Sequence, residues 1–262
     1  MQLYICTYGR SDNQVTWQNL PPSVREFTTL VVQDREKDLY PQYPTLVLPP
    51  DITRIGPTRQ FLVDYTLRQG QSQVLLMADD DLSFATRRQD EPSKFTPATG
   101  QEIQDLLEHM DSVAHLYAHV GVSPRDGANR RTEPALYNTR MTTRLSAYNV
   151  RMLQREGIRF DDMECMEDFH VTLSLLELGY KNVVINSMIH DQKGSNTVGG
   201  CSHFRTPEVQ AAAAYELKRR HPDFVTVVQK ETKHSWGGGV RTDVRVQWKR
   251  AYQSAGNTDI LD

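Results

Sequence analysis

Short apolar runs alternate with amphipathic stretches along this chain of 262 residues. The apolar runs are rich in β-branched residues and are bounded by glycine, proline or polar residues, which is typical of buried strands. They occupy residues 3–6, 29–32, 46–48, 74–78, 119–122, 183–186 and 224–228, and an alternating segment over 243–248 predicts a half-exposed strand. The regular exchange of strand and helix patterns favours an α/β fold.

Helix start and stop signals stand between these strands. Thr99 and Glu102 form a capping box in front of an apolar stripe, and Gly70 and Gly179 each end a helical pattern. The predicted helices run from Pro57 to Gly70, from Thr99 to about Val113, from Glu167 to Leu178, and from Pro207 to about Arg220 after a Thr206 cap. The stretches 8–27, 83–98, 123–140 and 190–205 are predicted as loops, and loops as long as the last two are usually functional or mobile.

Composition places the chain among ordinary globular proteins. It has 38% hydrophobic and 24% charged residues, and 30 basic against 33 acidic residues give a net charge of −3. Its apolar content argues against a disordered chain, no apolar run reaches the roughly 18 residues of a membrane span, and the average charge gives no general attraction to phosphate. Cys6, Cys165 and Cys201 are far apart, and the first residues lack a signal-peptide pattern. We therefore expect reduced thiols and a cytoplasmic protein.

The most distinctive motif is VLLMADDDLSF, residues 74–84, in which an apolar strand runs directly into three aspartates. Adjacent carboxylates repel one another and lose hydration at a strand end, and a divalent cation would offset this cost. Strand alternation places Asp79 and Asp81 on one side, so both could face one Mg²⁺ or Mn²⁺ ion at the sheet edge where ligands bind. The alternative is a solvated acidic turn, but the preceding apolar run favours a metal site.

An acidic pair opens the predicted helix of MECMEDFHVTLSLLELGY, residues 163–180. Glu167 and Asp168 would stabilise a helix start through the macrodipole, and helix N-termini often have this composition. Such a carboxylate could instead act as a general base that takes a proton from an attacking hydroxyl group. The motif on its own does not decide between these two roles.

A histidine follows a predicted strand in MIHDQKGSNTVGGCSH, residues 188–203. His190 could complete a metal site, and Lys193 could contact a phosphate group. His203 is a rival for the role of His190, and either histidine could be structural or exposed. The glycines of this segment would let its backbone approach a ligand closely.

Two weaker candidates lie near the first strand and the first predicted helix. Thr7, Tyr8 and Arg10, in ICTYGRS, offer a hydroxyl, a ring and a cation of the kinds that contact a nucleotide. Arg59, in RIGPTRQFL, adds a cation near a helix start. Each of these residues is unremarkable by itself, because an arginine on a helix is usually solvated.

Taken in order, these segments resemble the GT-A glycosyltransferases, which transfer sugars from nucleotide-sugar donors. The chain is more closely similar to the glycosyltransferases associated with base J and with TET/JBP-type DNA hydroxylases, which are found largely in bacteriophages. The resemblance rests on five segments that together extend from residue 3 to about residue 203, namely ICTYGR, RIGPTRQ, MADDDLSF, MEDFHVTLSLLELGY and HDQKGSN with GGCS. It implies a GT-A-like catalytic part over 1–205. Residues 206–262 match this family less clearly, and their own pattern predicts a C-terminal helix and a basic, aromatic extension packed on the same domain.

The resemblance also implies roles for the residues of the metal and the donor. Asp79 and Asp81 look like the DxD carboxylates that bind Mn²⁺ or Mg²⁺ and the donor, and His190 resembles the histidine that closes the metal site. The three consecutive aspartates, with Asp80 in the middle, leave the exact ligands open. Lys193 is expected to help neutralise the charge on the departing diphosphate.

A second set of roles concerns the nucleoside and the acceptor. Thr7, Tyr8 and Arg10 look like a nucleoside pocket, for uridine, and Arg59 resembles the helix cation that faces the donor. Asp168, with Glu167 beside it, is similar to the acidic pair that supplies the base of inverting enzymes. For this family the expected acceptor is the hydroxyl of a 5-hydroxymethylpyrimidine in DNA, reached by base flipping or another local distortion.

Local charge offers two candidate surfaces for such an acceptor. Residues 123–159 hold eight arginines against three acidic residues, and residues 232–252 hold five basic residues against one acidic residue, together with aromatic rings. Basic residues with interleaved aromatics suit contact with a nucleic-acid backbone and stacking on bases. The candidates are Arg130, Arg131, Trp236, Arg241, Lys249 and Arg250. The alternative is that these runs are solvated faces and that the tryptophans, with Trp248 among them, belong to the core.

Three other functions remain open at this point. The same fold could serve an acceptor other than DNA (a glycan, a lipid or a protein), or it could transfer a nucleotide and release pyrophosphate. A non-catalytic binder of modified DNA is a further alternative, although its acidic set would be expected to have decayed. A phage origin would place the protein in the host cytoplasm.

Overall fold

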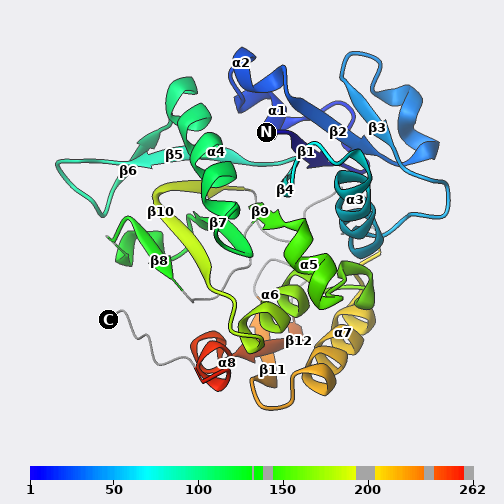
Figure 1. Ribbon diagram of the computed structural model, residues 1–262, viewed down its shortest axis with the longest axis vertical. Coiled ribbons are helices and arrows are strands. Elements are labelled where there is room, and N and C mark those ends of the chain that lie inside the picture. Colours follow the sequence, from blue (N-terminus) through cyan, green and yellow to red (C-terminus); the bar gives the residue numbers. More distant parts are fainter. Residues whose placement is uncertain (132, 138–143, 193–203, 233–238, 257–262) are drawn as a thin grey trace.

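The computed structural model describes residues 1–131, 133–137, 144–192, 204–232 and 239–256. Its centre is a mixed sheet with the strand order β3-β2-β1-β4-β9-β7-β10-β5-β6, in which β8 pairs with β10. The strands are β1 (Leu3–Cys6), β2 (Thr28–Val32), β3 (Thr45–Val47), β4 (Val74–Asp79), β5 (Ser83–Arg87), β6 (Phe95–Pro97), β7 (His119–Pro124), β8 (Ala135–Tyr137), β9 (Leu145–Asn149) and β10 (Asn182–Asp191). The predicted α/β fold, a Rossmann-like mixed sheet flanked by helices, is confirmed (Figure 1).

Strand direction changes once the sheet passes its centre. Strands β3, β2, β1 and β4 are parallel neighbours, whereas β9 runs antiparallel to both β4 and β7. Strand β10 pairs parallel with β7 and antiparallel with β5, and its register with β7 shifts between Ile185 and Ile189. The carboxyl ends of β1 and β4 and the first residues of β9 therefore share one edge of the sheet.

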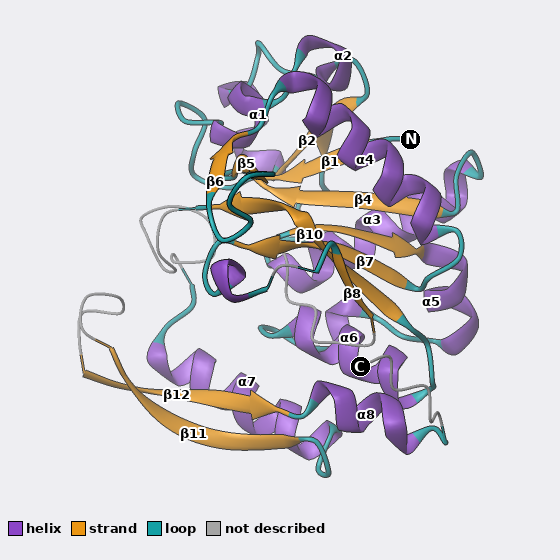
Figure 2. Ribbon diagram, turned by 90° about the vertical axis from the view of Figure 1, so that its left-hand side faces the viewer, coloured by secondary structure: helices purple, strands orange, loops and turns teal. Residues whose placement is uncertain are grey.

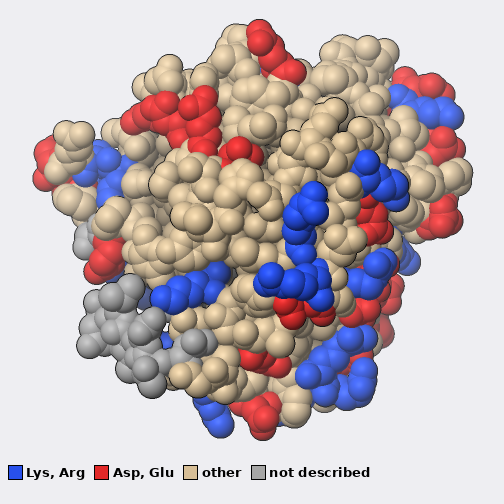
Figure 3. Space-filling model, in the orientation of Figure 1, with Lys and Arg blue, Asp and Glu red and all other residues tan. Residues whose placement is uncertain are grey.

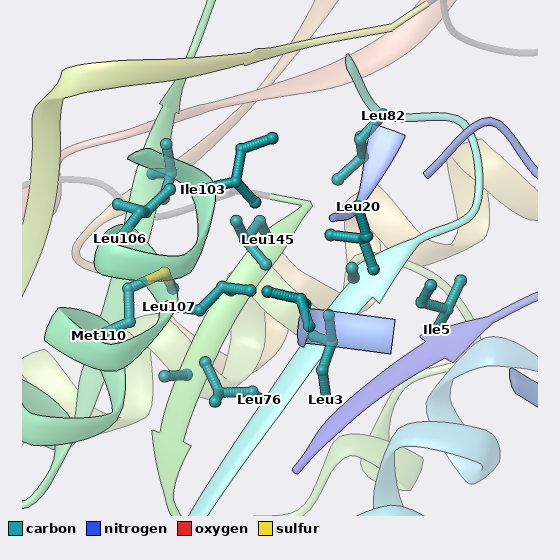
Figure 4. Packing of buried hydrophobic residues seen from close by; sticks show 14 of the residues in the cluster. Leu3, Ile5, Leu20, Leu76, Leu82, Ile103, Leu106, Leu107, Met110 and Leu145 are labelled. Carbon is teal, nitrogen blue, oxygen red and sulfur yellow. The ribbon is translucent and has the colours of Figure 1, made fainter. Parts of the chain in front are cut away.

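Helices cover both faces of this sheet. The helices are α1 (Val15–Asn19), α2 (Pro22–Arg25), α3 (Ile55–Gln69), α4 (Gly100–Ala114), α5 (Val150–Glu156) and α6 (Glu167–Glu177), with short 3₁₀ turns η1 (Asp34–Leu39), η2 (Ala128–Arg130) and η3 (Phe160–Asp162). One core joins the sheet to α4, whose Ile103, Leu106, Leu107 and Met110 pack against Leu76 and its neighbours (Figure 4). Alternate residues such as Leu75 and Met77 point to the other face and pack against α3, α5 and α6.

The last part of the chain packs on α6. It consists of α7 (Pro207–Arg220), β11 (Val225–Thr232), β12 (Gly239–Val246) and α8 (Trp248–Ser254). Strands β11 and β12 form an antiparallel ribbon that lies apart from the main sheet (Figure 2). Leu173 and Leu176 of α6 share a buried cluster with Leu217 of α7 and Tyr252 of α8. This ribbon therefore has a core of its own beside α6.

Local sequence signals explain the elements that were predicted. The capping box of Thr99 and Glu102 is present at the start of α4, and the Thr206 side chain accepts a hydrogen bond from Val209 N at the start of α7. Gly70 ends α3 in a left-handed conformation with φ of 64°, which glycine adopts without strain. The eight predicted strands all overlap observed ones, with ends that differ by a few residues.

The prediction of structureless loops was wrong in three places. Helices α1 and α2 lie in 8–27, strands β5 and β6 lie in 83–98, and β8 lies in 123–140. These elements are short and half-exposed, so they leave no continuous apolar run or long stripe in the sequence. Strand β12 also ends at Val246, and Trp248 begins α8 instead of ending a strand.

Candidate active site

The sequence motifs meet at the sheet edge where β1 and β4 end. Because these strands are parallel neighbours, Thr7 and Arg10 after β1 lie beside the aspartates at residues 79–81. Strand β9 returns to this edge, and Asp79 N donates a hydrogen bond to the carbonyl oxygen of Arg144 at 2.9 Å. The N-terminal turns of α3 and α6 supply Arg59 and Glu167. The fold therefore brings together residues that are up to about 160 positions apart in the sequence.

Asp80 supports the site from inside. Its side chain is buried, Thr7 Oγ1 donates a hydrogen bond to its Oδ2 at 2.6 Å, and Arg10 forms an ion pair with its Oδ1. Thr7 in turn accepts a hydrogen bond from Gln14 Nε2 at 2.8 Å. Burial raises the pKa of Asp80 to about 6, although the charge of Arg10 opposes the shift. Thr7 and Asp80 are thus both buried, and their side chains are hydrogen-bonded to one another.

Asp79 and Asp81 lie nearer the surface, each beside arginine. Asp79 Oδ2 is 2.9 Å from Arg144 Nη1, and its Oδ1 is 3.5 Å from Arg59 Nη2. Asp81 Oδ2 is 3.1 Å from Arg10 Nη1. The Oδ1 atom of Asp81 is buried and has no hydrogen-bond partner within the described part of the chain. An unpartnered buried carboxylate oxygen is unfavourable, and a bound cation would satisfy it.

Gly56 lets α3 approach the segment that precedes α6. A Cβ atom at this position would lie 2.7 Å from the carbonyl oxygen of Met163 and 2.9 Å from that of Phe160. Only glycine therefore fits this approach without a shift of backbone. Because Arg59 is one turn further along α3, the same approach places its guanidinium between β4 and α6.

Arg59 connects the aspartate motif to the acidic pair of α6. Its Nη1 donates a hydrogen bond to Glu167 Oε1 at 2.7 Å, while its Nη2 faces Asp79. Burial lowers the pKa of Arg59, but the charges of Glu167, Asp79 and Asp168 outweigh burial and the net shift is upward. This cation is therefore held between two parts of the site by charges of both.

The two acidic residues of α6 differ in environment. Glu167 is buried, and burial raises its pKa while Arg59 opposes that shift. Asp168 is half-exposed, and its Oδ1 accepts a hydrogen bond of 3.0 Å from Phe169 N. Met166 just before them has a φ of 60°, an uncommon left-handed conformation for a residue other than glycine. This backbone turn leaves Glu167 pointing inward and Asp168 open to solvent.

His190 lies at the end of β10 beside Arg144. Its Nε2 is 3.5 Å from Arg144 N, and its buried Nδ1 has no hydrogen-bond partner among the residues that the structure describes. Burial, with the charge of Arg144, lowers the pKa of His190 to about 4, against the opposing charge of Asp79. The imidazole is therefore neutral near pH 7, the form that binds metals.

The carboxylates of Asp79 and Asp81 are oxygen ligands of the kind that a divalent cation binds. In this structure they are paired with arginine side chains instead. Over the described ranges, no three His, Cys, Asp or Glu side chains gather closely enough to hold a metal ion. The five carboxylates of Asp79, Asp80, Asp81, Glu167 and Asp168 nevertheless outnumber the guanidiniums of Arg10, Arg59 and Arg144 by two charges. A divalent cation carries the charge that would cancel this excess.

Tyr8 borders the site on the side of β2. The guanidinium of Arg35 lies 4.8 Å from the centre of its ring, and Arg35 Nη2 donates a hydrogen bond to Tyr8 Oη at 2.7 Å. The backbone N of Gly9 donates to both carboxylate oxygens of Glu36, at 3.0 and 3.1 Å. An aromatic ring with a cation on its face is an environment suited to a nucleobase or a phosphate.

Arg144 and Arg35 were not predicted as site residues. Arg144 was missed because β9 was not foreseen, although the short run LSAYN directly after it resembles a strand. Arg35 lies in η1 within a charged stretch that offers no motif. Lys193 and His203 lie outside the described residues.

The described residues of the basic run over 123–159 lie at different places on the sheet, and the prediction that Arg130 and Arg131 contact DNA stays a prediction. Arg144 belongs to the site itself, and β9 then crosses the sheet so that Arg151 and Arg155 on α5 lie near its opposite edge. Arg130 is exposed and Arg131 is half-exposed, next to the turn that follows β7. A strand that reverses direction separates charges that are close in sequence.

The C-terminal basic segment has mixed environments. Arg241 Nη2 and Lys230 Nζ both pair with Asp243, at 2.6 and 2.9 Å, whereas Lys249 and Arg250 are exposed on α8. Trp248 packs against Phe169 with 5.3 Å between ring centres, and Tyr252 is buried. Tyr252 therefore belongs to the core, and the half-buried Trp248 packs against it. Trp236 lies outside the described residues.

Comparisons with known proteins give relatives of the sequence and of the fold. A protein of Enterobacteria phage T2 named beta-glucosyl-HMC-alpha-glucosyl-transferase is 21% identical over 220 residues, 77% of this chain and 75% of its own length. The solved mannose-1-phosphate geranyltransferase of Thermus thermophilus is 11% identical, with a TM-score of 0.43 over 72% of this chain and 75% of its own. A protein from STIV is 9% identical, with a TM-score of 0.39 over 72% and 84% of the two chains.

No described helix is long and apolar enough to cross a membrane.

The family of this chain follows from a match to most of its length. The family model for the TET-associated glycosyltransferases matches residues 1–200, which include the aspartate motif, the Arg59 helix and the acidic pair. The resemblance inferred from the motifs is thereby confirmed: this chain belongs to the TET-associated glycosyltransferase family.

Proposed function

We propose that this protein transfers a sugar from a UDP-sugar to the hydroxyl of a 5-hydroxymethylpyrimidine in DNA. The observation that carries the proposal is the placement of Asp168, a half-exposed carboxylate whose charge acts on Arg59, the residue that pairs with Asp79 and Glu167. The name of the phage T2 relative, which refers to HMC as part of its acceptor, supports a modified base as the acceptor class here.

Asp168 acts as the general base in this proposal. It accepts the proton of the acceptor hydroxyl while the hydroxyl oxygen forms a bond to the anomeric carbon of the sugar. The bond between that carbon and the UDP oxygen breaks in the same step, and UDP leaves with the electron pair. Attack opposite the leaving group inverts the anomeric configuration, so we propose an inverting reaction.

Arginine side chains stabilise the departing diphosphate. Arg10, Arg59 and Arg144 are held at the site by carboxylates, and bidentate guanidiniums match phosphate oxygens well. Arg59 is the most firmly held of the three, because its Nη1 also donates a hydrogen bond to the buried carboxylate of Glu167. The Tyr8 and Arg35 pair is proposed to face the uridine.

A divalent cation fits the same cluster. Asp79, Asp81 and neutral His190 would hold Mn²⁺ or Mg²⁺, which would supply positive charge at the diphosphate oxygens. The unpartnered Oδ1 of Asp81 and Nδ1 of His190 are the atoms that most need such a partner. Metal dependence therefore belongs to the proposal together with the UDP donor.

One experiment tests both substrates. Several UDP-sugars are combined with DNA that contains 5-hydroxymethylcytosine, 5-hydroxymethyluracil or glucosylated hydroxymethylcytosine, UDP release is followed, and the digested nucleosides are weighed by mass spectrometry. We expect a mass increase of one sugar on 5-hydroxymethylcytosine or on 5-hydroxymethyluracil. Transfer to glucosylated hydroxymethylcytosine alone would show that the acceptor hydroxyl belongs to the glucose and not to the base. The third DNA is included because the name of the T2 relative refers to a glucosylated base. Transfer to a glycan, a lipid or a protein but to none of the DNAs would overturn the proposal, and release of pyrophosphate would indicate nucleotidyl transfer.

The metal is tested with the substitution Asp81→Asn. Removal of one ligand charge is expected to lower turnover at least about 100-fold at a fixed Mn²⁺ concentration, because charge stabilisation of the leaving group contributes several kcal/mol. Mn²⁺ is also expected to raise the Tm of the wild type but not of the variant, since a ligand stabilises the state that binds it. Normal metal-dependent turnover in the variant would show that Asp81 is not a ligand.

A further inference from the structure

A polar pocket lies beside the candidate active site, between the β5–β6 hairpin and the turn that follows β7. Its volume is about 510 Å³, and its lining includes Arg88, Lys94, Phe95, Arg125 and Asn129. The mechanism above uses none of these residues. The family resemblance of the sequence gives them no role either, and 83–98 carried no predicted site.

Arg87 holds the walls of this pocket together. Its Nε donates a hydrogen bond to the carbonyl oxygen of Asn186 in β10, and its Nη2 donates to that of Ala128 in the turn, both at 3.1 Å. The Phe95 ring of β6 lies 4.6 Å from the Arg87 guanidinium and packs on a small buried cluster. One side chain therefore ties the hairpin, β10 and the turn into a single unit, and the pocket is preformed.

The pocket is continuous with the site through the backbone. Arg125 N donates a hydrogen bond of 2.9 Å to the carbonyl oxygen of His190, and Arg125 Nε lies 3.4 Å from Asp191 Oδ2. Strand β5, which begins the hairpin, starts at Ser83, two positions after Asp81. Strand β5 thus leads from the aspartate motif to the pocket, whose lining residues Arg88 and Phe95 lie at the far end of this strand.

The charged side chains of the pocket are exposed, and their ion pairs are weak. The cations are Arg88, Lys94 and Arg125, and their carboxylate partners are Asp90, Glu91 and Asp191. All six side chains are exposed by more than a third, and ion pairs of this kind contribute little because water screens them. A phosphate group can displace these carboxylates, since guanidiniums and ammoniums bind phosphate with several hydrogen bonds. Among the lining residues, the three cations stand against one carboxylate, Asp126, because Asp90, Glu91 and Asp191 do not line the pocket.

We propose that this pocket binds a backbone phosphate of the acceptor DNA strand, close to the modified base. The inference rests on the proposed function, because it assumes that DNA is the acceptor. Lys94 and Arg125 contact the phosphate, and Phe95 orients the Arg125 guanidinium, which lies 5.9 Å from its ring centre. The pocket positions the strand so that the base hydroxyl reaches Asp168, and it contributes to affinity without reading sequence.

The test is the double substitution Lys94→Ala with Arg125→Ala, compared with Lys218→Ala and Arg219→Ala at the end of α7. Both pairs remove one lysine and one arginine, so the net charge changes equally. Steady-state transfer gives KM for DNA and for the UDP-sugar, and fluorescence anisotropy gives Kd for the same oligonucleotide over a range of salt concentrations. Thermal unfolding shows that each variant is folded.

We expect the pocket variant to raise KM and Kd for DNA about tenfold and to reduce the slope of log Kd against log salt by about 1, as loss of neutralisation at one phosphate predicts. KM for the UDP-sugar is expected to stay unchanged in the pocket variant. In the α7 variant, KM and Kd for DNA are both expected to stay unchanged. An unchanged Kd and salt slope overturns the proposal, and so does a rise in KM for the UDP-sugar alone, which would assign the pocket to the donor. If the wild type transfers sugar to no DNA, the proposed function fails, while the Kd comparison still decides whether the pocket binds phosphate.

Discussion

The two ends of the central sheet carry similar residues in very different states. At the carboxyl ends of β1 and β4, Arg59 and Arg144 pair with Asp79, which is 20 and 65 positions away in the sequence. The side chains of Arg59 and Asp79 are 14% and 22% exposed, whereas that of Arg144 is 38% exposed. At the opposite end, Arg155 pairs with its neighbour Glu156 and remains exposed. Figure 3 shows basic side chains over α5 and α7, interspersed with acidic ones.

The difference shows which charges locate a site. A salt bridge between neighbours in sequence can form on any solvated surface, and it contributes little to stability. A cluster that collects charges from β1, α3, β4, β9 and α6 exists only because the fold brings five segments to one place, and buried charges are retained only when they are paired. Long-range pairing is therefore better evidence of function than the local count of arginines.

The largest predicted effect at the site end belongs to Asp168→Asn. Asparagine keeps the size of the side chain but cannot take the proton of the acceptor, so kcat is expected to fall about 100- to 10,000-fold with little change in KM for the UDP-sugar. Steady-state transfer to modified DNA measures both values. A folded variant with nearly normal kcat would show that Asp168 is not the base.

Glu167→Gln is the matched comparison for this prediction. Glutamine can still accept a hydrogen bond from Arg59, so a loss of about tenfold in kcat is expected, which reflects weaker positioning of that cation. Its effect should stay below that of Asp168→Asn at every pH tested. The reverse order would move the role of base to Glu167.

The sequence predicted the location of the site better than its contacts. The apolar run before Asp79 is enough to place the aspartates at a strand end, and the helix signals around Pro57 and Glu167 are local. The bridge from Arg59 to Glu167 spans 108 positions, and no local pattern encodes it. The inward turn of Glu167 depends on the backbone of Met166, whose conformation is set by tertiary packing and not by propensity.

Prediction was weakest where strands are short and polar. Strand β9 carries Arg144 into the site but is five residues long, and β5 and β6 form a hairpin whose residues are only partly buried. These elements are held by pairing with neighbouring strands, an interaction between distant segments that leaves no periodic signal. The pocket beside His190 was missed for the same reason.

A second prediction concerns His119, the first residue of β7, which pairs with Tyr148 near the α5 end of the sheet. Its ring stacks on Tyr148 with 4.1 Å between centres, and burial, with a smaller effect of the Arg59 charge, lowers its pKa to about 3. An unfolded histidine takes up a proton near pH 6.5. The free energy of unfolding is therefore expected to be constant for this group above about pH 6.5 and to fall by about 1.4 kcal/mol per pH unit below it, until about pH 3.

The variant His119→Phe measures this contribution. Phenylalanine retains a ring against Tyr148 but does not titrate, so urea unfolding between pH 7 and pH 5 should show a slope smaller by about one proton than that of the wild type. Buried His170, whose pKa burial lowers to about 4, accounts for part of the slope that remains. An identical slope in the two proteins would mean that His119 is already accessible to protons in the folded state.

The smallest predicted effect is at the opposite end of the sheet, and it completes the comparison. Arg151→Ala with Arg155→Ala removes two exposed cations of α5, and Arg155 there contacts only nearby surface groups, Glu156 and Tyr180. We expect the free energy of unfolding to change by no more than about 1 kcal/mol, because exposed pairs are screened by water. Affinity for modified DNA and its salt dependence should stay unchanged, although these arginines belong to the same basic run as Arg125 and Arg144. A tenfold loss of DNA affinity in this variant would place the acceptor on the α5 end and would break the link between buried long-range charge and the position of the site.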